Sequence, residues 1–153
     1  MTERPVFDAF KKLLGQTEPK RDTAVDPHEA AVALMVEAAL SDGIYANLES
    51  DMIAEILIES FGFDAARTDT LMQRGELLAE EAIGAHQFTK LVKTLPQTER
   101  IAVIEGLYRV ALADGDKCKF EEAYIRHVAS LLHVDDVNRA NARKRAETRI
   151  QTL

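Results

Sequence analysis

The feature that most constrains the fold is a short pattern that the chain contains twice. Residues 39–43 read Ala-Leu-Ser-Asp-Gly, and 72 positions later residues 111–115 read Ala-Leu-Ala-Asp-Gly. In both copies a Glu follows the Gly after six residues and an Ile follows the Glu after four. Aligned without a gap, residues 37–53 and 109–125 are identical at six of 17 positions. We therefore predict an internal duplication, with a helix before and a helix after each Asp-Gly pair.

Length and composition favour one all-helical domain. A chain of 153 residues buries enough surface to hold a core without disulfides or metals. Seven Gly, four Pro and no Trp accompany many Ala, Leu and Glu residues, which are strong helix formers. The single cysteine, Cys118, excludes an intrachain disulfide and fits a reducing compartment. Because no apolar run approaches 18 residues and the N-terminus lacks the apolar core of a signal peptide, we expect no transmembrane segment and a cytoplasmic location.

Charge and motif content argue against nucleic-acid binding and against catalysis. The net charge of −7 opposes binding to phosphate backbones. The chain has no Gly-x-Ser-x-Gly motif, no phosphate-binding glycine loop and no His-Glu-x-x-His motif, and its histidines lie far apart at positions 28, 86, 127 and 133. We therefore expect no enzyme activity.

The N-terminal residues differ from the rest of the chain. Phe7, Phe10 and Leu14 recur at helical spacing within residues 5–14, whereas residues 15–25 have no apolar period. We divide the chain into an amphipathic helix with a flexible linker at 1–25 and a helical domain at 26–153. The helix is expected to dock on its own domain, or alternatively to make a weak contact with a membrane surface or a partner.

Apolar periodicity and capping residues predict the helices of the domain. Asp26, Pro27 and Glu29 form a capping box before an apolar segment that we place in the middle of the fold, Gly62 ends the second helix, and Asp64 caps the third. We expect the third helix to be peripheral, with Leu71, Leu77 and Leu78 facing inward. The expected helices cover residues 26–41, 48–61, 64–83, 86–95, 98–112, 120–132 and 136–150.

The last predicted helix is strongly basic. Val137, Ala140, Ala142, Ala146 and Ile150 are its expected apolar residues, and its cations are Arg139, Arg143, Lys144, Arg145 and Arg149. Cations late in a helix complement the helix dipole, so we expect a solvated end. The alternative is a docking patch for an acidic partner.

The repeated turns carry the carboxylates of a candidate cation site. Asp42 with Glu49, and Asp114 with Asp116 and Glu121, have the spacing of the second half of a calcium-binding loop. The first half is missing, because the chain has apolar residues at 38, 40, 110 and 112, so we exclude an ordinary calcium-binding hand. A weaker site for a hard cation stays open. The alternative is that these residues only cap and stabilise helix ends.

Cys118 supports a different hypothesis. It lies between Lys117 and Lys119, two cations that would lower its pKa and favour the thiolate. A redox or oxyanion-handling stress factor would depend on this residue.

The doubled pattern, together with residues 88–91 (Phe-Thr-Lys-Leu) and 99–101 (Glu-Arg-Ile), resembles the TerB-like family over about residues 26–149. That family includes the tellurite-resistance protein TerB and the N-terminal domain of a membrane-anchored DnaJ-type co-chaperone. The resemblance implies a single all-α domain of about seven helices with a pseudo-two-fold, in which the two Asp-Gly turns lie side by side. It also implies links to tellurite resistance and chemical stress, no established enzyme activity, and cation binding by the acidic residues of the turns. Carried over to this chain, those residues are Asp42, Glu49, Asp114, Asp116 and Glu121; Ile44 departs from the family by being apolar.

These observations lead to one functional expectation. We expect a non-catalytic helical module that binds a protein partner and is tuned by a divalent cation, one of Ca²⁺, Mg²⁺, Mn²⁺ or Zn²⁺, at the paired turns. The partner is not identified by the sequence, and a homo-oligomer stays open. The rivals are the redox factor that uses Cys118 and a peripheral membrane adaptor that uses the N-terminal helix.

Overall fold

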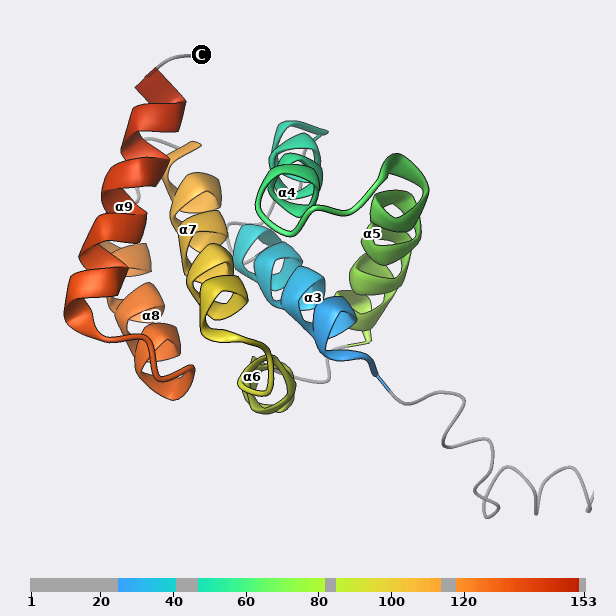
Figure 1. The fold of residues 1–153 in the computed structure, drawn as a ribbon, viewed down its shortest axis with the longest axis horizontal. Helices are drawn as coiled ribbons and strands as arrows, with labels where there is room; N and C mark the ends of the chain where they lie inside the picture. The colour runs from blue at the N-terminus through green and yellow to red at the C-terminus, as the bar shows by residue number, and fades with distance from the viewer. Residues whose placement is uncertain (1–24, 41–46, 82–84, 114–117, 152–153) are drawn as a thin grey trace, which may run out of the picture.

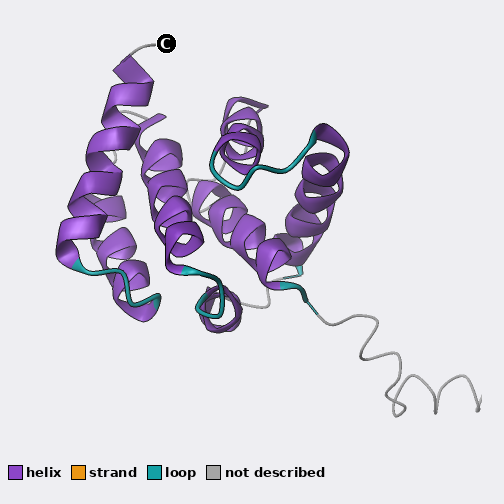
Figure 2. Cartoon of the chain, viewed as in Figure 1, coloured by secondary structure: helices purple, strands orange, loops and turns teal. Residues whose placement is uncertain are grey.

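The computed structural model describes residues 25–40, 47–81, 85–113 and 118–151. Within these ranges it contains seven α-helices and no strand (Figures 1 and 2), which confirms the all-α prediction. The helices are α3 (Pro27–Leu40), α4 (Asn47–Glu59), α5 (Ala65–Glu80), α6 (Ala85–Val92), α7 (Gln97–Ala113), α8 (Cys118–Leu131) and α9 (Asp136–Gln151). The predicted helix at 5–14 and the linker lie outside the described residues, so the division of the chain at residue 25 stays a prediction. The internal duplication also stays a prediction.

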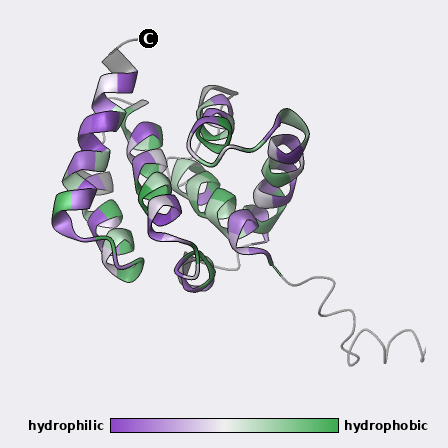
Figure 3. Cartoon of the chain, viewed as in Figure 1, coloured by the Kyte–Doolittle hydropathy of each residue, from purple (hydrophilic) through white to green (hydrophobic). Residues whose placement is uncertain are grey.

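Helix α3 lies at the centre of the fold. It packs against α4, α5, α6 and α7, and Figure 1 shows it between α5 and α7. Every residue from 30 to 36 is buried, and α3 is largely green in the hydropathy view of Figure 3. A helix that is apolar on all sides is stable only when other elements surround it. The predicted central position is therefore confirmed.

The start of α3 is fixed by the predicted capping box. The backbone N–H of His28 donates to Asp26 Oδ2 at 3.0 Å, and the N–H of Asp26 donates to Glu29 Oε1 at 3.2 Å. These two bonds satisfy amides that a helix start otherwise leaves without a partner.

Two glycines allow neighbouring helices to approach α3 closely. A Cβ added at Gly75 of α5 would lie 2.3 Å from Val32 Cγ1, and one added at Gly106 of α7 would lie 2.5 Å from Met35 Sδ. A side chain at either position would separate the helices, since packed interiors contain no spare volume of that size. The α3–α5 and α3–α7 crossings therefore depend on these residues.

The connection between α4 and α5 agrees with the sequence prediction. Gly62 has φ +75°, a conformation that favours glycine, and the N–H of Arg67 donates to Asp64 Oδ1 at 2.8 Å.

The predicted burial of Leu77 is wrong, because its side chain is 47% exposed. The buried face of α5 runs through positions 68, 71, 72, 75, 78 and 79, spaced by three and four residues around Gly75, and Leu77 lies outside that stripe. The helix also ends at Glu80, earlier than the predicted Ile83.

Helix α9 packs along α7 with a face that differs from the predicted one. Val137 is 69% exposed and Ala140 is also exposed, so placing them in the apolar stripe was wrong. The buried positions are Arg139, Ala142 and Ala146, again three and four residues apart. The buried face thus includes Arg139, which the prediction had counted among the solvated cations.

The prediction of a solvated basic end for α9 was also wrong in part. Four of its five cations form ion pairs with three carboxylates on other helices. Arg139 and Arg143 pair with Glu122, Arg145 pairs with Glu105, and Arg149 pairs with Glu59. These side chains hold α9 against α8, α7 and α4.

None of the helices in the described ranges is both long and apolar enough to cross a membrane.

Candidate functional site

The five candidate cation ligands lie where α3 and α7 end and where α4 and α8 begin. Asp42, Asp114 and Asp116 lie outside the described residues. Glu49 and Glu121 fall in the first turns of α4 and α8, and the description does not extend to their side chains. Among the described residues, no group of three His, Cys, Asp or Glu side chains is arranged to hold a metal ion. The predicted site therefore stays a prediction.

Two of the helices that adjoin these segments pack against each other. Helices α3 and α7 are in contact, with Gly106 facing Met35, and both run toward the same side of the molecule in Figure 1. In the sequence, each ends immediately before one of the two Asp-Gly segments.

Glu37 is a half-buried carboxylate in the last turn of α3. Its Oε1 atom is buried and has no hydrogen-bond partner, and burial raises its pKa above the ordinary 4.5. Burial first, and then the charge of Glu37, raise the pKa of Tyr124 in α8 to about 12, so the two side chains lie close enough to interact. A carboxylate in such a place has lost hydration without a compensating partner. It lies within a turn of the segment that follows α3.

Arg109 occupies the position in the second copy that Glu37 occupies in the first. It is buried in α7 and forms an ion pair with Glu55 of α4, while its Nε atom has no hydrogen-bond partner. Both residues share one signal in the sequence, a charge with apolar neighbours on either side: Val36 and Ala38 around Glu37, and Tyr108 and Val110 around Arg109. That signal does not say which element the charged side chain will face.

A second polar cluster joins α7, α8 and α9 around Glu122. Its two carboxylate oxygens accept hydrogen bonds from Arg143 at 2.7 Å, Arg126 at 3.1 Å, Tyr108 at 3.2 Å and Arg139 at 3.4 Å. Arg139 also donates to the Tyr108 hydroxyl at 3.2 Å, and burial is the main reason that the pKa of Tyr108 is raised. Since Glu122 already accepts a hydrogen bond from each of these donors, the cluster is suited to stabilising the packing of α7, α8 and α9.

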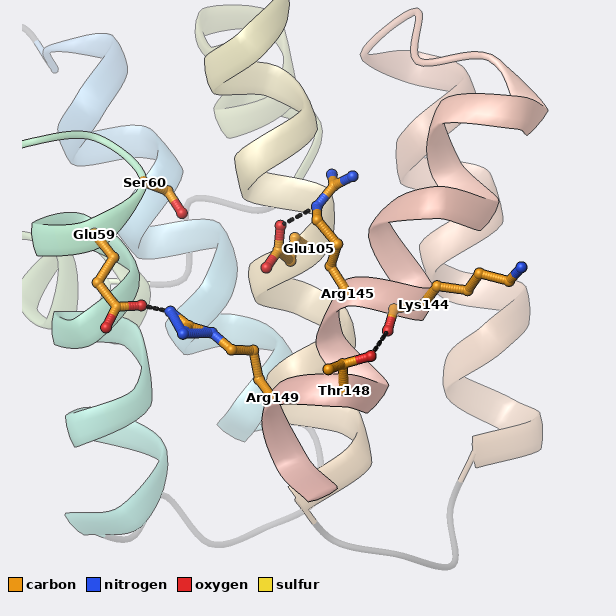
Figure 4. Close-up of a pocket in the computed structure, with 7 residues that line it drawn as sticks. All are labelled: Glu59, Ser60, Glu105, Lys144, Arg145, Thr148 and Arg149. Carbon is orange, nitrogen blue, oxygen red and sulfur yellow. Dashed lines mark hydrogen bonds and ion pairs between the residues drawn. The ribbon is translucent and has the colours of Figure 1, made fainter. Parts of the chain in front are cut away.

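The described residues also form a polar groove of about 540 Å³ between α4, α7 and α9 (Figure 4). Ion pairs reach across it from α9: the Nε of Arg145 donates to Glu105 Oε1 at 2.9 Å, and Arg149 pairs with Glu59. The residues that line the groove are Glu59, Ser60, Glu105, Lys144, Arg145, Thr148 and Arg149. Each of these residues carries a charged or hydroxyl group, while their carbon atoms supply most of the lining surface. The lining has no catalytic combination such as a nucleophile paired with a base.

Comparison with known proteins identifies the family. The family model described as "Tellurite resistance protein TerB" matches residues 28–144, which run from the start of α3 to the middle of α9. Neither a curated protein nor a solved structure matches the chain. A match over more than half of the chain confirms the resemblance drawn from the doubled Asp-Gly pattern, and the chain belongs to the TerB family of tellurite-resistance proteins.

Proposed function

We propose that this chain is a non-catalytic binding module of tellurite resistance, which binds a protein partner and is tuned by a divalent cation at the paired Asp-Gly turns. Membership of the TerB family supports the association with tellurite resistance. The cation part of the proposal concerns Asp42, Glu49, Asp114, Asp116 and Glu121, whose oxygen ligands suit hard cations such as Ca²⁺, Mg²⁺ or Mn²⁺ better than Zn²⁺.

The observation that carries the cation proposal is the Glu37 carboxylate. An ionised group that is partly buried and has an oxygen without a partner destabilises the fold unless a positive charge compensates it. Glu37 lies in the last turn of α3, close enough to Tyr124 of α8 for its charge to raise the pKa of that hydroxyl. A bound cation near these helix ends would supply the compensating charge.

The free energy of unfolding should depend on pH through the Glu37 carboxyl. The pKa of Glu37 is raised in the folded state, so between pH 4.5 and the raised pKa the native protein holds more protons than the unfolded chain. Stability from this group is therefore lost as the pH rises through that window. In metal-free protein at pH 7 we expect Glu37→Gln to be more stable than the unmodified chain by about 1 kcal/mol, or roughly 2–4 °C in the unfolding midpoint. The advantage should shrink toward pH 4.

A divalent cation should reverse that order. The cation should raise the midpoint of the unmodified chain more than that of Glu37→Gln, because binding to the native state stabilises it by mass action. Glu80→Gln is the matched control, since Glu80 is an exposed α5 carboxylate with the same charge. Equal cation responses from all three proteins would contradict a role for Glu37.

A further inference from the structure

We infer that the groove between α4, α7 and α9 binds an acidic segment of a partner protein through the guanidinium group of Arg145. This inference rests on the proposed function in one respect, since it names the chemistry of the protein partner. It concerns a different set of residues from the paired turns.

The charge of the groove is the first reason. Three cations of α9, Lys144, Arg145 and Arg149, line it, against the two carboxylates of Glu59 and Glu105. The lining therefore has a net charge of +1 on a chain whose total is −7. A positive site on an acidic protein attracts acidic segments while the rest of the surface repels them, which favours binding at that one place.

The geometry of Arg145 is the second reason. Its Nε donates to Glu105, a carboxylate only 14% exposed, and in Figure 4 its two terminal nitrogens point away from that partner. The side chain is nevertheless 51% exposed. Glu105 therefore holds the guanidinium in one orientation and leaves the pair of nitrogens that bind a carboxylate in a two-bond fork.

The remaining lining groups favour a peptide over a phosphate. Glu59 and Glu105 repel a doubly charged phosphate more strongly than the single negative charge of a peptide carboxylate. The Thr148 hydroxyl donates to the Lys144 carbonyl at 3.0 Å, so its oxygen can still accept from a backbone N–H. A strand of peptide offers both kinds of group, carboxylates for the arginine and N–H donors for the acceptors.

The experiment measures binding of a fluorescein-labelled Glu-Gly repeat peptide of about ten residues by fluorescence anisotropy. We expect saturable binding to the full chain, and a loss of about tenfold in affinity for Arg145→Gln, because the change removes both charged hydrogen bonds of the fork. Lys90→Gln, which removes an exposed cation of α6, is the matched control and should bind as the unmodified chain does. Arg145→Lys keeps the charge without the fork and should bind with intermediate affinity.

Four results would overturn the inference. The first is equal weakening by Arg145→Gln and Lys90→Gln, which would mean non-specific attraction. The second is no binding of the Glu-Gly peptide, and the third is equal binding of a Gln-Gly repeat peptide. The fourth is complete competition by millimolar inorganic phosphate at constant ionic strength, which would identify a small-anion site. The unfolding midpoint of each variant shows that it is folded. If the peptide does not bind but a divalent cation still raises the unfolding midpoint, only the groove proposal is rejected. If the peptide binds but no cation raises the midpoint, only the cation-site proposal is rejected.

Discussion

Replacing Gly75 with alanine is expected to destabilise the protein by about 3 kcal/mol, which lowers the unfolding midpoint by roughly 6–12 °C. The added Cβ would lie 2.3 Å from Val32 Cγ1, 2.7 Å from Val32 Cβ and 3.2 Å from the backbone nitrogen of Ala33. Val32 is fully buried and β-branched, so its side chain has no alternative rotamer to adopt, and the backbone atom of α3 cannot move without the helix. Helices α3 and α5 would have to separate. Thermal or denaturant unfolding measures the loss.

Gly106→Ala is the matched control for this prediction. The neighbour there is the flexible end of Met35, with Ile56 Cδ1 at 3.0 Å, so the side chains can adjust. Alanine also improves helix propensity by about 1 kcal/mol, and the net loss should stay within about 1 kcal/mol. A second check is the Val32→Ala, Gly75→Ala pair, whose combined loss should be smaller than the sum because the first change makes room for the second. Equal losses for Gly75→Ala and Gly106→Ala would contradict the close α3–α5 crossing.

Glu122→Gln is the second change with a large expected effect, a loss of about 2–3 kcal/mol. It removes the carboxylate charge that faces Arg139 on α8, and it also removes a partner of Arg143 and Arg126. Arg139 is 9% exposed and keeps a carboxylate at 3.5 Å, that of Asp136, whose side chain is 94% exposed. A buried cation that loses its more buried partner is destabilising. Because Glu122 is itself partly exposed, we expect less than the full effect of a completely buried pair. Urea unfolding with an unchanged m-value would measure it.

Glu147→Gln separates this effect from a general loss of charge. Glu147 pairs with Arg143 at 3.0 Å, but both side chains are substantially exposed, and such pairs contribute less than about 1 kcal/mol. The Glu122→Gln, Arg139→Met double change should recover part of the stability, since it removes the buried cation that the single change leaves with the exposed carboxylate of Asp136. A double variant no more stable than Glu122→Gln would show that Glu122 acts through something other than Arg139.

The sequence predicted those elements of the fold whose causes are local. The capping box at Asp26, the turn at Gly62 and the cap at Asp64 each depend on residues within three positions of one another, and all were confirmed. The central position of α3 followed from its apolar circumference, because such a helix has no face for water. The family followed from the doubled pattern.

The features that the sequence did not predict depend on other helices. Arg139 is buried because Tyr108 of α7 and Glu122 of α8 meet it, and neither partner can be inferred from the period of α9. Leu77 is exposed because Gly75 sets the face of α5 that meets α3. The groove likewise needs three helices from distant parts of the chain, so its lining residues had no common signal in the sequence.

The most direct test of the central claim, that the chain is a cation-tuned binding module, is thermal unfolding of metal-free protein with and without millimolar Ca²⁺, Mg²⁺, Mn²⁺ or Zn²⁺. The Asp114→Asn, Glu121→Gln double variant is measured in parallel. We predict that at least one cation raises the midpoint of the unmodified chain and that the double variant loses this rise. If no cation changes the midpoint, or if the double variant responds as fully as the unmodified chain, the paired turns serve only as helix caps and the claim is wrong.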